Sequence, residues 1–328
     1  MAESEFSRLP QSRQVAYTSD VAPVVLVGAA FFDIKGRVGR DFHPGSSNAG
    51  VVRLSFGGAA RNIAENLARL DAPTVLLTAI GDDGQGRRLV LHTRAAGVGL
   101  ADETLIVDRQ ASTGSYLALL QADGQLVAGV YDTAVLRSIT PRAVHRWHRH
   151  LRNAALVVAD ANLRPQTLAV IAALCRRYGI GLCLDPVSVA LAGRIRPHLR
   201  DALLITPNMR EAAALSGLPV RTRDEALAAA RALQESGPEV VVVTMAHGGA
   251  VYASADASGH VPAVETDVID ATGAGDALTA GVLFGLLNDF PLDDAIALGT
   301  SMASLTMLSS ETVRSDLTLE QVYQHLKL

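Results

Sequence analysis

The sequence contains few residues that could form disulfide bonds or a zinc site. Its 328 residues include only two cysteines, Cys175 and Cys183. Cys175 lies in an apolar helical pattern and Cys183 in a strand-like run, so we expect both to be buried thiols. The nine histidines form no Cys/His cluster with zinc-ligand spacing. The sequence therefore argues against a fold held together by disulfides or zinc.

The sequence also lacks a long hydrophobic run and a strong excess of either charge. No apolar run reaches the ~18 residues that a membrane-spanning helix needs. The first 20 residues are polar and lack the apolar core of a signal peptide. We therefore expect residues 1–20 to be a flexible tail on a cytoplasmic protein with no membrane partner. A net charge of −4 argues against a nucleic-acid partner.

What the sequence does contain is a regular pattern of apolar segments. Hydrophobic residues make up 49% and charged residues 19%, which suits a well-packed core. Short apolar runs typical of buried strands alternate with stretches of helical periodicity, which predicts an α/β fold with helices on both faces of a parallel sheet. The predicted strands are 24–28, 74–80, 156–159, 181–184, 203–205 and 240–244, and the predicted helices include 59–70, 166–178 and 224–236.

Polar residues or glycines stand at the ends of several predicted strands. Ligands of parallel sheets bind beyond the carboxyl ends of the strands, so these residues are predicted to share one site. They are Gly28, Asp160, Asp185, Asn208 and Thr244.

Two segments do not fit this alternation of strands and helices. Residues 33–55 alternate weakly and are rich in Gly, Ser and Asn, and residues 112–131 alternate more clearly around a turn at Asp123-Gly124. We interpret them as a small β-sheet that projects from one large domain, residues 21–328.

The loop Asp270-Ala271-Thr272-Gly273-Ala274-Gly275-Asp276 precedes an apolar, helix-like run. Small residues that open a helix leave backbone N–H groups free to bind an anion. The backbone of Gly273, Ala274 and Gly275 is therefore the candidate anion hole. A carboxylate there would repel a phosphate unless it acts as the base that takes a proton from an attacking hydroxyl, so Asp276 is the candidate base. The alternative is an N-capping Asp after a glycine turn.

Three motifs in this order resemble those of the ribokinase-like (PfkB) carbohydrate and nucleoside kinases. They are Gly57–Ala68, Asn208-Met209-Arg210-Glu211 and Asp270–Asp276, and the resemblance covers residues 22–315. It implies a three-layer α/β/α fold with a mainly parallel central sheet, a small β-sheet lid over the acceptor, and ATP as phosphate donor. Within the family, Pro44–Asn48 and Ala60–Leu67 look most like the pseudouridine kinases.

The resemblance also implies which residues bind the acceptor. Asp33 matches the sugar-binding Asp of the family, and a carboxylate can accept hydrogen bonds from two sugar hydroxyls; otherwise it is a solvated loop Asp. Gly57 and Gly58 allow the backbone to approach a sugar closely. Asn62, early on the following helix, can offer a donor and an acceptor to hydroxyls, or it is simply an exposed helical Asn.

Three further residues are candidates for the acceptor site. Asn162 follows the strand 156–159 and could reach the acceptor. Ser47 and Asn48 could bind the edge of a base or sugar, although Ser-Asn pairs are also common in turns.

Asn208 and Glu211 are candidate magnesium residues. At positions i and i+3 of a starting helix they share a face, and magnesium prefers a few protein oxygens together with water. The competing interpretation is a capping box, in which Asn208 caps the helix and Glu211 returns the hydrogen bond. Both roles can hold at once.

The resemblance assigns further residues to the nucleotide and to a monovalent cation. Thr244 and Gly249 delimit what looks like the nucleotide loop. Asn208 and Thr272 are further candidate nucleotide-binding residues. The loop departs from the family at Ala246, where glycine is usual. Asp270 and Thr272 resemble the start of a potassium site.

Taken together, these features predict an ATP- and magnesium-dependent kinase that phosphorylates the 5′-hydroxyl of a small sugar or nucleoside, with pseudouridine as the leading acceptor. The rivals are ribose, fructose 6-phosphate, adenosine or inosine as acceptor, or a catalytically silent ligand-binding protein. A dehydrogenase is disfavoured because Gly28–Asp33 contains no Gly-x-Gly-x-x-Gly. We also expect a homodimer formed through the lid, because the edges of lid strands would be exposed in a monomer.

Overall fold

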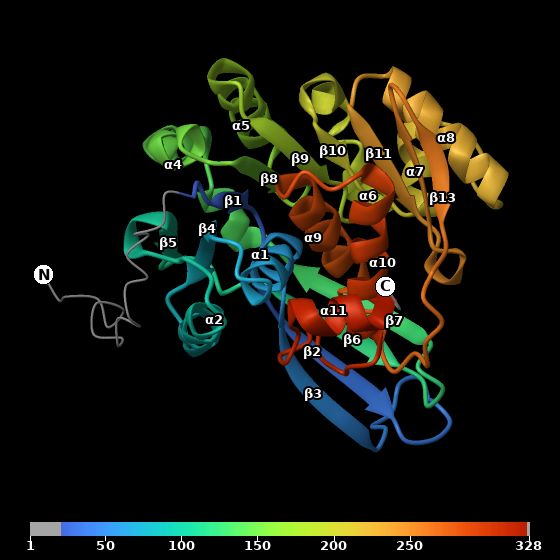
Figure 1. Cartoon of the computed structure of the whole chain (residues 1–328). Helices are drawn as coiled ribbons and strands as arrows, with labels where there is room; N and C mark the ends of the chain where they lie inside the picture. Colours follow the sequence, from blue (N-terminus) through green and yellow to red (C-terminus); the bar gives the residue numbers. More distant parts are fainter. Residues whose placement is uncertain (1–20, 327–328) are drawn as a thin grey trace, which may run out of the picture.

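The computed structural model describes residues 21–326 of the chain, shown in Figure 1. The predicted tail, residues 1–20, lies outside the described residues.

The described part of the chain contains a large sheet of nine strands, in the spatial order β13-β12-β11-β10-β9-β8-β1-β4-β5. All pairs from β11 to β5 are parallel, and β12 and β13 add antiparallel strands at one edge. The mainly parallel sheet predicted from the sequence is therefore confirmed. The bounds are β1 Val24–Val27, β4 Thr74–Gly81, β5 Leu105–Asp108, β8 Leu156–Asp160, β9 Gly181–Asp185, β10 Leu204–Ile205, β11 Val240–Thr244, β12 Ala250–Ser254 and β13 Ser258–Val261.

Helices cover both faces of the large sheet. Side chains alternate between the two faces of each strand, so each face contributes to its own buried cluster. On β1, Val25 and Val27 join one buried cluster and Leu26 joins the other. The first cluster includes side chains of α3 Pro141–Arg146, α4 His148–Arg152, α5 Pro165–Tyr178, α6 Val189–Ala192, α7 Met209–Ser216 and α8 Arg223–Glu235. The second includes those of α1 Ala59–Arg69, α2 Gly84–Ala95, α9 Ala274–Leu287, α10 Leu292–Met307 and α11 Leu319–Leu326.

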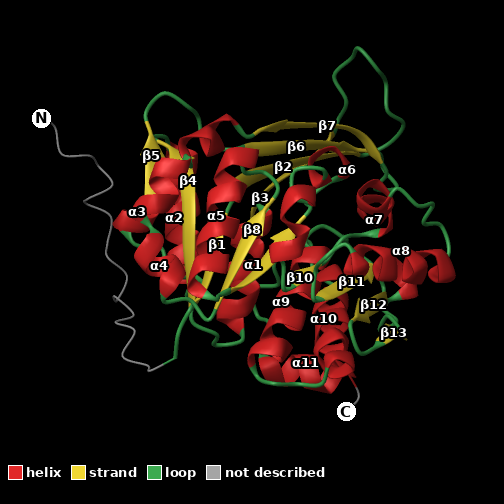
Figure 2. Cartoon of the chain, turned by 90° about the horizontal axis from the view of Figure 1, so that it is seen from above, coloured by secondary structure: helices red, strands yellow, loops and turns green. Residues whose placement is uncertain are grey.

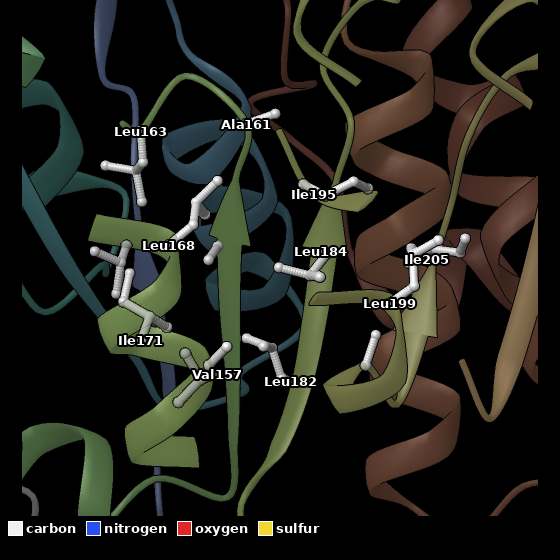
Figure 3. Close-up of a cluster of buried hydrophobic side chains, with 14 of the residues drawn as sticks. Val157, Ala161, Leu163, Leu168, Ile171, Leu182, Leu184, Ile195, Leu199 and Ile205 are labelled. Atoms are coloured by element: carbon white, nitrogen blue, oxygen red, sulfur yellow. The ribbon is translucent and has the colours of Figure 1, made fainter. Parts of the chain in front are cut away.

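Figure 3 shows part of the first cluster, where Leu168 and Ile171 of α5 face the strand β8, which carries Val157. Burying such side chains from water is the main force that holds helices onto a sheet. No described helix combines the length and the apolar character needed to cross a lipid bilayer.

A second, four-stranded sheet has the order β3-β2-β6-β7, with bounds β2 Phe31–Val38, β3 Gly50–Gly57, β6 Ser115–Leu120 and β7 Leu126–Asp132. Its outer pairs are antiparallel, whereas β2 and β6 run parallel. Figure 2 shows β2, β6 and β7 side by side along one edge of the molecule. The two segments that departed from the βα rhythm thus pair with each other, although they lie far apart in the sequence.

The two faces of this small sheet differ in character. Asp33 and Lys35 of β2 are buried. The residue between them, Ile34, is aligned across the sheet with Leu54, Leu117 and then Val130. Leu54, Leu117 and Val130 are 53%, 47% and 66% exposed. One face therefore presents polar groups to the body, and the other presents an apolar row to the outside.

Candidate active site

The loop before α9 has the backbone that an anion site requires. Gly273 has a φ of 84°, and a Cβ there would come within 2.0 Å of the Thr312 carbonyl oxygen, so only glycine fits. A Cβ on Gly275, by contrast, would meet open space. No side chain caps α9, which begins at Ala274. The first-turn N–H groups of a helix have no partner within the helix, so this end can bind a negative group.

Asp276 is not the N-cap of α9. It is the third residue of the helix, and the cap position belongs to Gly273. Its Oδ2 accepts a hydrogen bond of 2.7 Å from Nδ2 of Asn62 in α1. Burial, reinforced by the charges of Asp160 and Asp33, raises the pKa of Asp276 to about 7, although the Asn62 hydrogen bond and the Arg61 charge oppose the rise. A carboxylate with this pKa is well matched to a general base at neutral pH.

Asp33 lies near Asp276 at the start of the small sheet, and burial raises its pKa to about 6. The cations Lys35 and Arg61 oppose that rise, and Asp270 adds to it. Gly57 lies on the neighbouring strand β3, where a Cβ would come within 2.2 Å of Asp33 Oδ2. The glycine therefore makes room for the carboxylate.

Gly58 is also required by the backbone. It has a φ of 95°, and a Cβ there would come within 2.4 Å of the Ala29 carbonyl oxygen. The structure thus brings Asp33, Gly57, Gly58 and Asn62, predicted for the acceptor, to the same place as the candidate base.

Asp160 connects these segments through hydrogen bonds, a role that was not predicted from the sequence. Its side chain is inaccessible to solvent. Its Oδ2 accepts hydrogen bonds from the backbone N–H groups of Ala29 at 2.7 Å and Ala60 at 3.2 Å, and its Oδ1 accepts one from Asn162 at 3.0 Å. This one carboxylate joins the end of β1, the start of α1 and the loop after β8, so it fixes the position of Asn162.

The side chain of Asn48 serves its own loop. Its Oδ1 accepts a hydrogen bond of 2.8 Å from the His43 N–H, and its Nδ2 donates to the carbonyl oxygens of His43 and Ser46, both at 3.0 Å. Ser47 is exposed in the same loop between β2 and β3. Base recognition by Ser47 and Asn48 stays a prediction, and the turn role is present.

Asn208 and Glu211 form the predicted capping box of α7. Asn208 Oδ1 accepts hydrogen bonds of 3.0 Å from the N–H groups of Arg210 and Glu211, and Glu211 Oε2 accepts one of 2.9 Å from the Asn208 N–H. Burial raises the pKa of Glu211. Burial, followed by the charges of Asp276, Glu211 and Asp160, raises the pKa of nearby Asp185 well above its usual range.

A divalent cation would relieve the repulsion between these acids. Within residues 21–326, however, no three acidic, His or Cys side chains are grouped closely enough to hold a metal by themselves. The donor set therefore fits magnesium that takes most of its ligands from water and from phosphates, which is how this ion is usually bound.

The nucleotide-loop candidate lies next to the capping box, since Thr244 pairs with Asn208 and its N–H donates to the Pro207 carbonyl oxygen at 2.9 Å. Ala246, at the position where the family usually has glycine, has a φ of 50°. The loop thus keeps a left-handed backbone despite the side chain. Gly249 has a φ of 80°, and a Cβ there would come within 2.1 Å of the Val261 carbonyl oxygen.

Asp270 has protein partners on both carboxylate oxygens. Lys35 Nζ lies 2.6 Å from Oδ2, and Oδ1 accepts hydrogen bonds from the Thr272 N–H at 2.9 Å and the Thr272 hydroxyl at 2.7 Å. Lys35 was not predicted from the sequence, although its position two residues after Asp33 on a strand puts both side chains on one face.

The comparison with known families agrees with these motifs. The chain matches the pfkB family carbohydrate kinases over residues 22–319 and therefore belongs to that family. The chain is 30% identical to a pseudouridine kinase of Escherichia coli K12 over 300 residues, which are 91% of this chain and 95% of the relative.

Other relatives act on other acceptors. A ribokinase of Staphylococcus aureus is 28% identical over 305 residues, 92% of this chain and 98% of the relative. The structure of Arabidopsis thaliana ribokinase complexed with ribose and ATP shares the fold, with a TM-score of 0.82 and 21% identity over 94% of this chain and 99% of that one. The ribokinase-like fold is thus confirmed.

Proposed function

We propose that this pfkB-family kinase transfers the γ-phosphate of ATP to the 5′-hydroxyl of a sugar or nucleoside, with Asp276 as general base. The observation that carries the proposal is the position of Asp276, which has a pKa of about 7 in the first turn of α9 and lies beside the acceptor candidates Asn62 and Asp33. The ribose- and ATP-bound relative of the same fold supports both the donor and the kind of acceptor.

Asp33 holds acceptor hydroxyls, and Asp276 takes the proton of the attacking 5′-hydroxyl. That oxygen forms a bond to the γ-phosphorus while the bond between the γ-phosphorus and the bridging oxygen breaks, and ADP leaves with the electron pair. The backbone N–H groups at Gly273–Gly275 and the α9 dipole would stabilise the charge on the transferring group. Magnesium would neutralise charge on the phosphates.

The magnesium role of Glu211 can be separated from its capping role. Glu211→Gln keeps an oxygen that can accept from the Asn208 N–H, so α7 should remain capped, but it removes the charge. We expect the magnesium concentration for half-maximal rate to rise several-fold, since a charged ligand or water acceptor is lost. EDTA should abolish the activity, and magnesium or manganese should restore it.

The matched control is Glu225→Gln in α8. Glu225 occupies the same third position in a capping box, with Thr222 as the cap. Its magnesium titration should equal that of the wild type. If the Glu211 and Glu225 variants give the same titration, Glu211 only caps its helix.

We propose pseudouridine as the preferred acceptor, on the strength of the Pro44–Asn48 and Ala60–Leu67 motifs and the similarity to the E. coli pseudouridine kinase. Pseudouridine carries one ring N–H that uridine lacks. A site with a buried partner for that N–H would reject uridine, because the partner would be left unpaired. We expect kcat/KM for pseudouridine to exceed that for uridine by roughly ten- to a hundredfold. The loop with Ser47 and Asn48 and the strands β6 and β7 are the places where this partner should lie.

An ATP-consumption assay over pseudouridine, uridine, adenosine, inosine, ribose and fructose 6-phosphate tests this preference. Equal rates with uridine and pseudouridine, or faster turnover of ribose, would reject pseudouridine while leaving the kinase proposal in place. The similarity to a ribokinase makes ribose the main competitor.

We propose that two chains pair through the exposed face of the small sheet. Leu54, Leu117 and Val130 form an apolar row there, and such rows commonly mark interfaces. Sedimentation should then give twice the 34.4 kDa of one chain, and Val130→Asp should give a single chain. A monomer at micromolar concentration would contradict this pairing.

Potassium dependence, which the family resemblance implies, is proposed with Asp270 and Thr272 as the candidate residues. Lys35 could take the place of a potassium ion, because its ammonium group already provides a positive charge at Asp270. A rate that stays the same when tetramethylammonium replaces potassium would assign the balancing charge to Lys35 alone.

A further inference from the structure

The side chain of Arg61 is buried behind the candidate base, next to Asn62 in the sequence. Arg61 is 1% exposed. Its Nη1 donates to the Phe56 carbonyl oxygen at 2.8 Å and to Asn62 Oδ1 at 2.7 Å. Its Nη2 pairs with Glu65, one helical turn further along α1. A buried guanidinium group with these three partners is held in one orientation.

This contact fixes which way the Asn62 amide points. A guanidinium group can only donate hydrogen bonds, so the Asn62 atom that faces Arg61 must be the carbonyl oxygen. The NH₂ group is then turned to the other side, where Nδ2 donates to Asp276 Oδ2 at 2.7 Å. A flipped amide would set a carbonyl oxygen against the carboxylate and an NH₂ group against the guanidinium, and both contacts would be repulsive.

We propose that Arg61 is a positioning residue for the phosphoryl transfer, because it holds the Asn62 amide so that the amide donates to Asp276. The proposal rests on the proposed function, in which Asp276 is the base. A donor at this oxygen stabilises the ionised carboxylate, which is the form that can accept a proton. Arg61 also sets a positive charge near Asp276, which lies among the carboxyl groups of Asp33, Asp160 and Asp185.

Arg61 also connects Asn62 to the small sheet through Phe56. Phe56 lies near the end of β3, so the same Nη1 atom joins the small sheet to Asn62. The Thr312 hydroxyl donates to the same carbonyl oxygen at 2.6 Å. A carbonyl contact of Thr312 is also what excludes a side chain at Gly273. These contacts therefore connect the end of β3, the Asn62 amide and the loop before α9.

The experiment uses the pH dependence of kcat/KM for the acceptor. In Arg61→Lys the charge remains, but the fork that reaches both Phe56 and Asn62 is lost. In the double variant Arg61→Met with Glu65→Gln, both charges of the buried pair are removed, so no unpaired ion is left between them. We expect the acid limb of the profile to move up by about one pH unit in both variants, which is roughly tenfold in rate at pH 6. The loss should shrink at alkaline pH, and KM for ATP should stay the same.

Arg69→Gln is the control for the helix. Arg69 pairs with the other oxygen of Glu65 at 2.8 Å, and its second described contact is with the Ser315 carbonyl oxygen. Its acid limb should not move. An unmoved limb in both Arg61 variants, or a rate that falls by one factor at every pH, would overturn the proposal. If Asp276→Asn remains active, the base assignment itself fails; if that variant is inactive and the Arg61 limb stays in place, only the role of Arg61 fails.

Discussion

Asp276→Asn should lower kcat by roughly 10²–10⁴-fold, the usual range for the loss of a general base. Asparagine has nearly the same shape, and Nδ2 of Asn62 can still donate to its side-chain oxygen. The backbone N–H groups at the start of α9 also remain, so the KM for ATP should change little. The measurement is steady-state kinetics with the best acceptor at saturating magnesium.

The pH profile adds a second check on the same residue. The pKa of Asp276 is raised to about 7, and only the deprotonated carboxylate can accept the proton. The rate of the wild type should therefore rise as the pH passes through about 7, and the residual rate of the Asn variant should lack this rise.

The matched control for this substitution is Asp294→Asn. Asp294 also lies in the first turn of a helix, α10. If Asp276→Asn stays within about threefold of the wild type, Asp276 is not the base.

The α/β architecture was predictable because burial leaves a periodic trace in the sequence. The run Val24–Val27 is apolar on both faces and folds as β1 in the middle of the sheet, between β4 and β8. The predicted helix 59–70 is α1 Ala59–Arg69. The hairpin of β12 and β13 was not predicted, since residues 258–261 are mostly exposed or half-buried and carry little apolar periodicity.

The backbone features of the candidate site were predictable from the sequence, whereas the contacts between distant side chains were not. The glycines 57, 58 and 273 and the box of Asn208 and Glu211 leave local signals, because tight turns and helix caps select residue types. Asn62 and Asp276 are 214 positions apart, and Lys35 and Asp270 are 235 apart. No local pattern reports such pairs.

Arg61 illustrates the same limit on sequence-based prediction. In a helical pattern an arginine is expected to be exposed, yet here it is among the largest fully buried side chains. Its burial depends on partners at the end of β3 and on its own helix, and these become visible only once the small sheet is placed against α1.

Asp33→Ala should weaken acceptor binding by roughly ten- to a hundredfold or more, since each hydrogen bond to a charged group contributes ~1.5–3 kcal/mol. ATP should bind as before, because the nucleotide candidates lie on other segments. Asp33→Asn removes the charge and keeps the shape, so its affinity for the acceptor should lie between those of the wild type and the Ala variant.

Burial raises the pKa of Asp33 to about 6. Protonation removes an acceptor, so the wild type should also bind the acceptor more weakly as the pH falls below about 6, and the Ala variant should not show this change.

Isothermal titration with acceptor, and separately with the ATP analogue AMP-PNP, measures both affinities for each variant. The control is Asp123→Ala, which removes a carboxylate from the exposed turn between β6 and β7 on the same small sheet. It should leave both affinities unchanged. A variant Asp33→Ala that loses ATP and acceptor affinity equally would show that the carboxylate holds the fold of the site, by packing against Gly57, and does not select the acceptor.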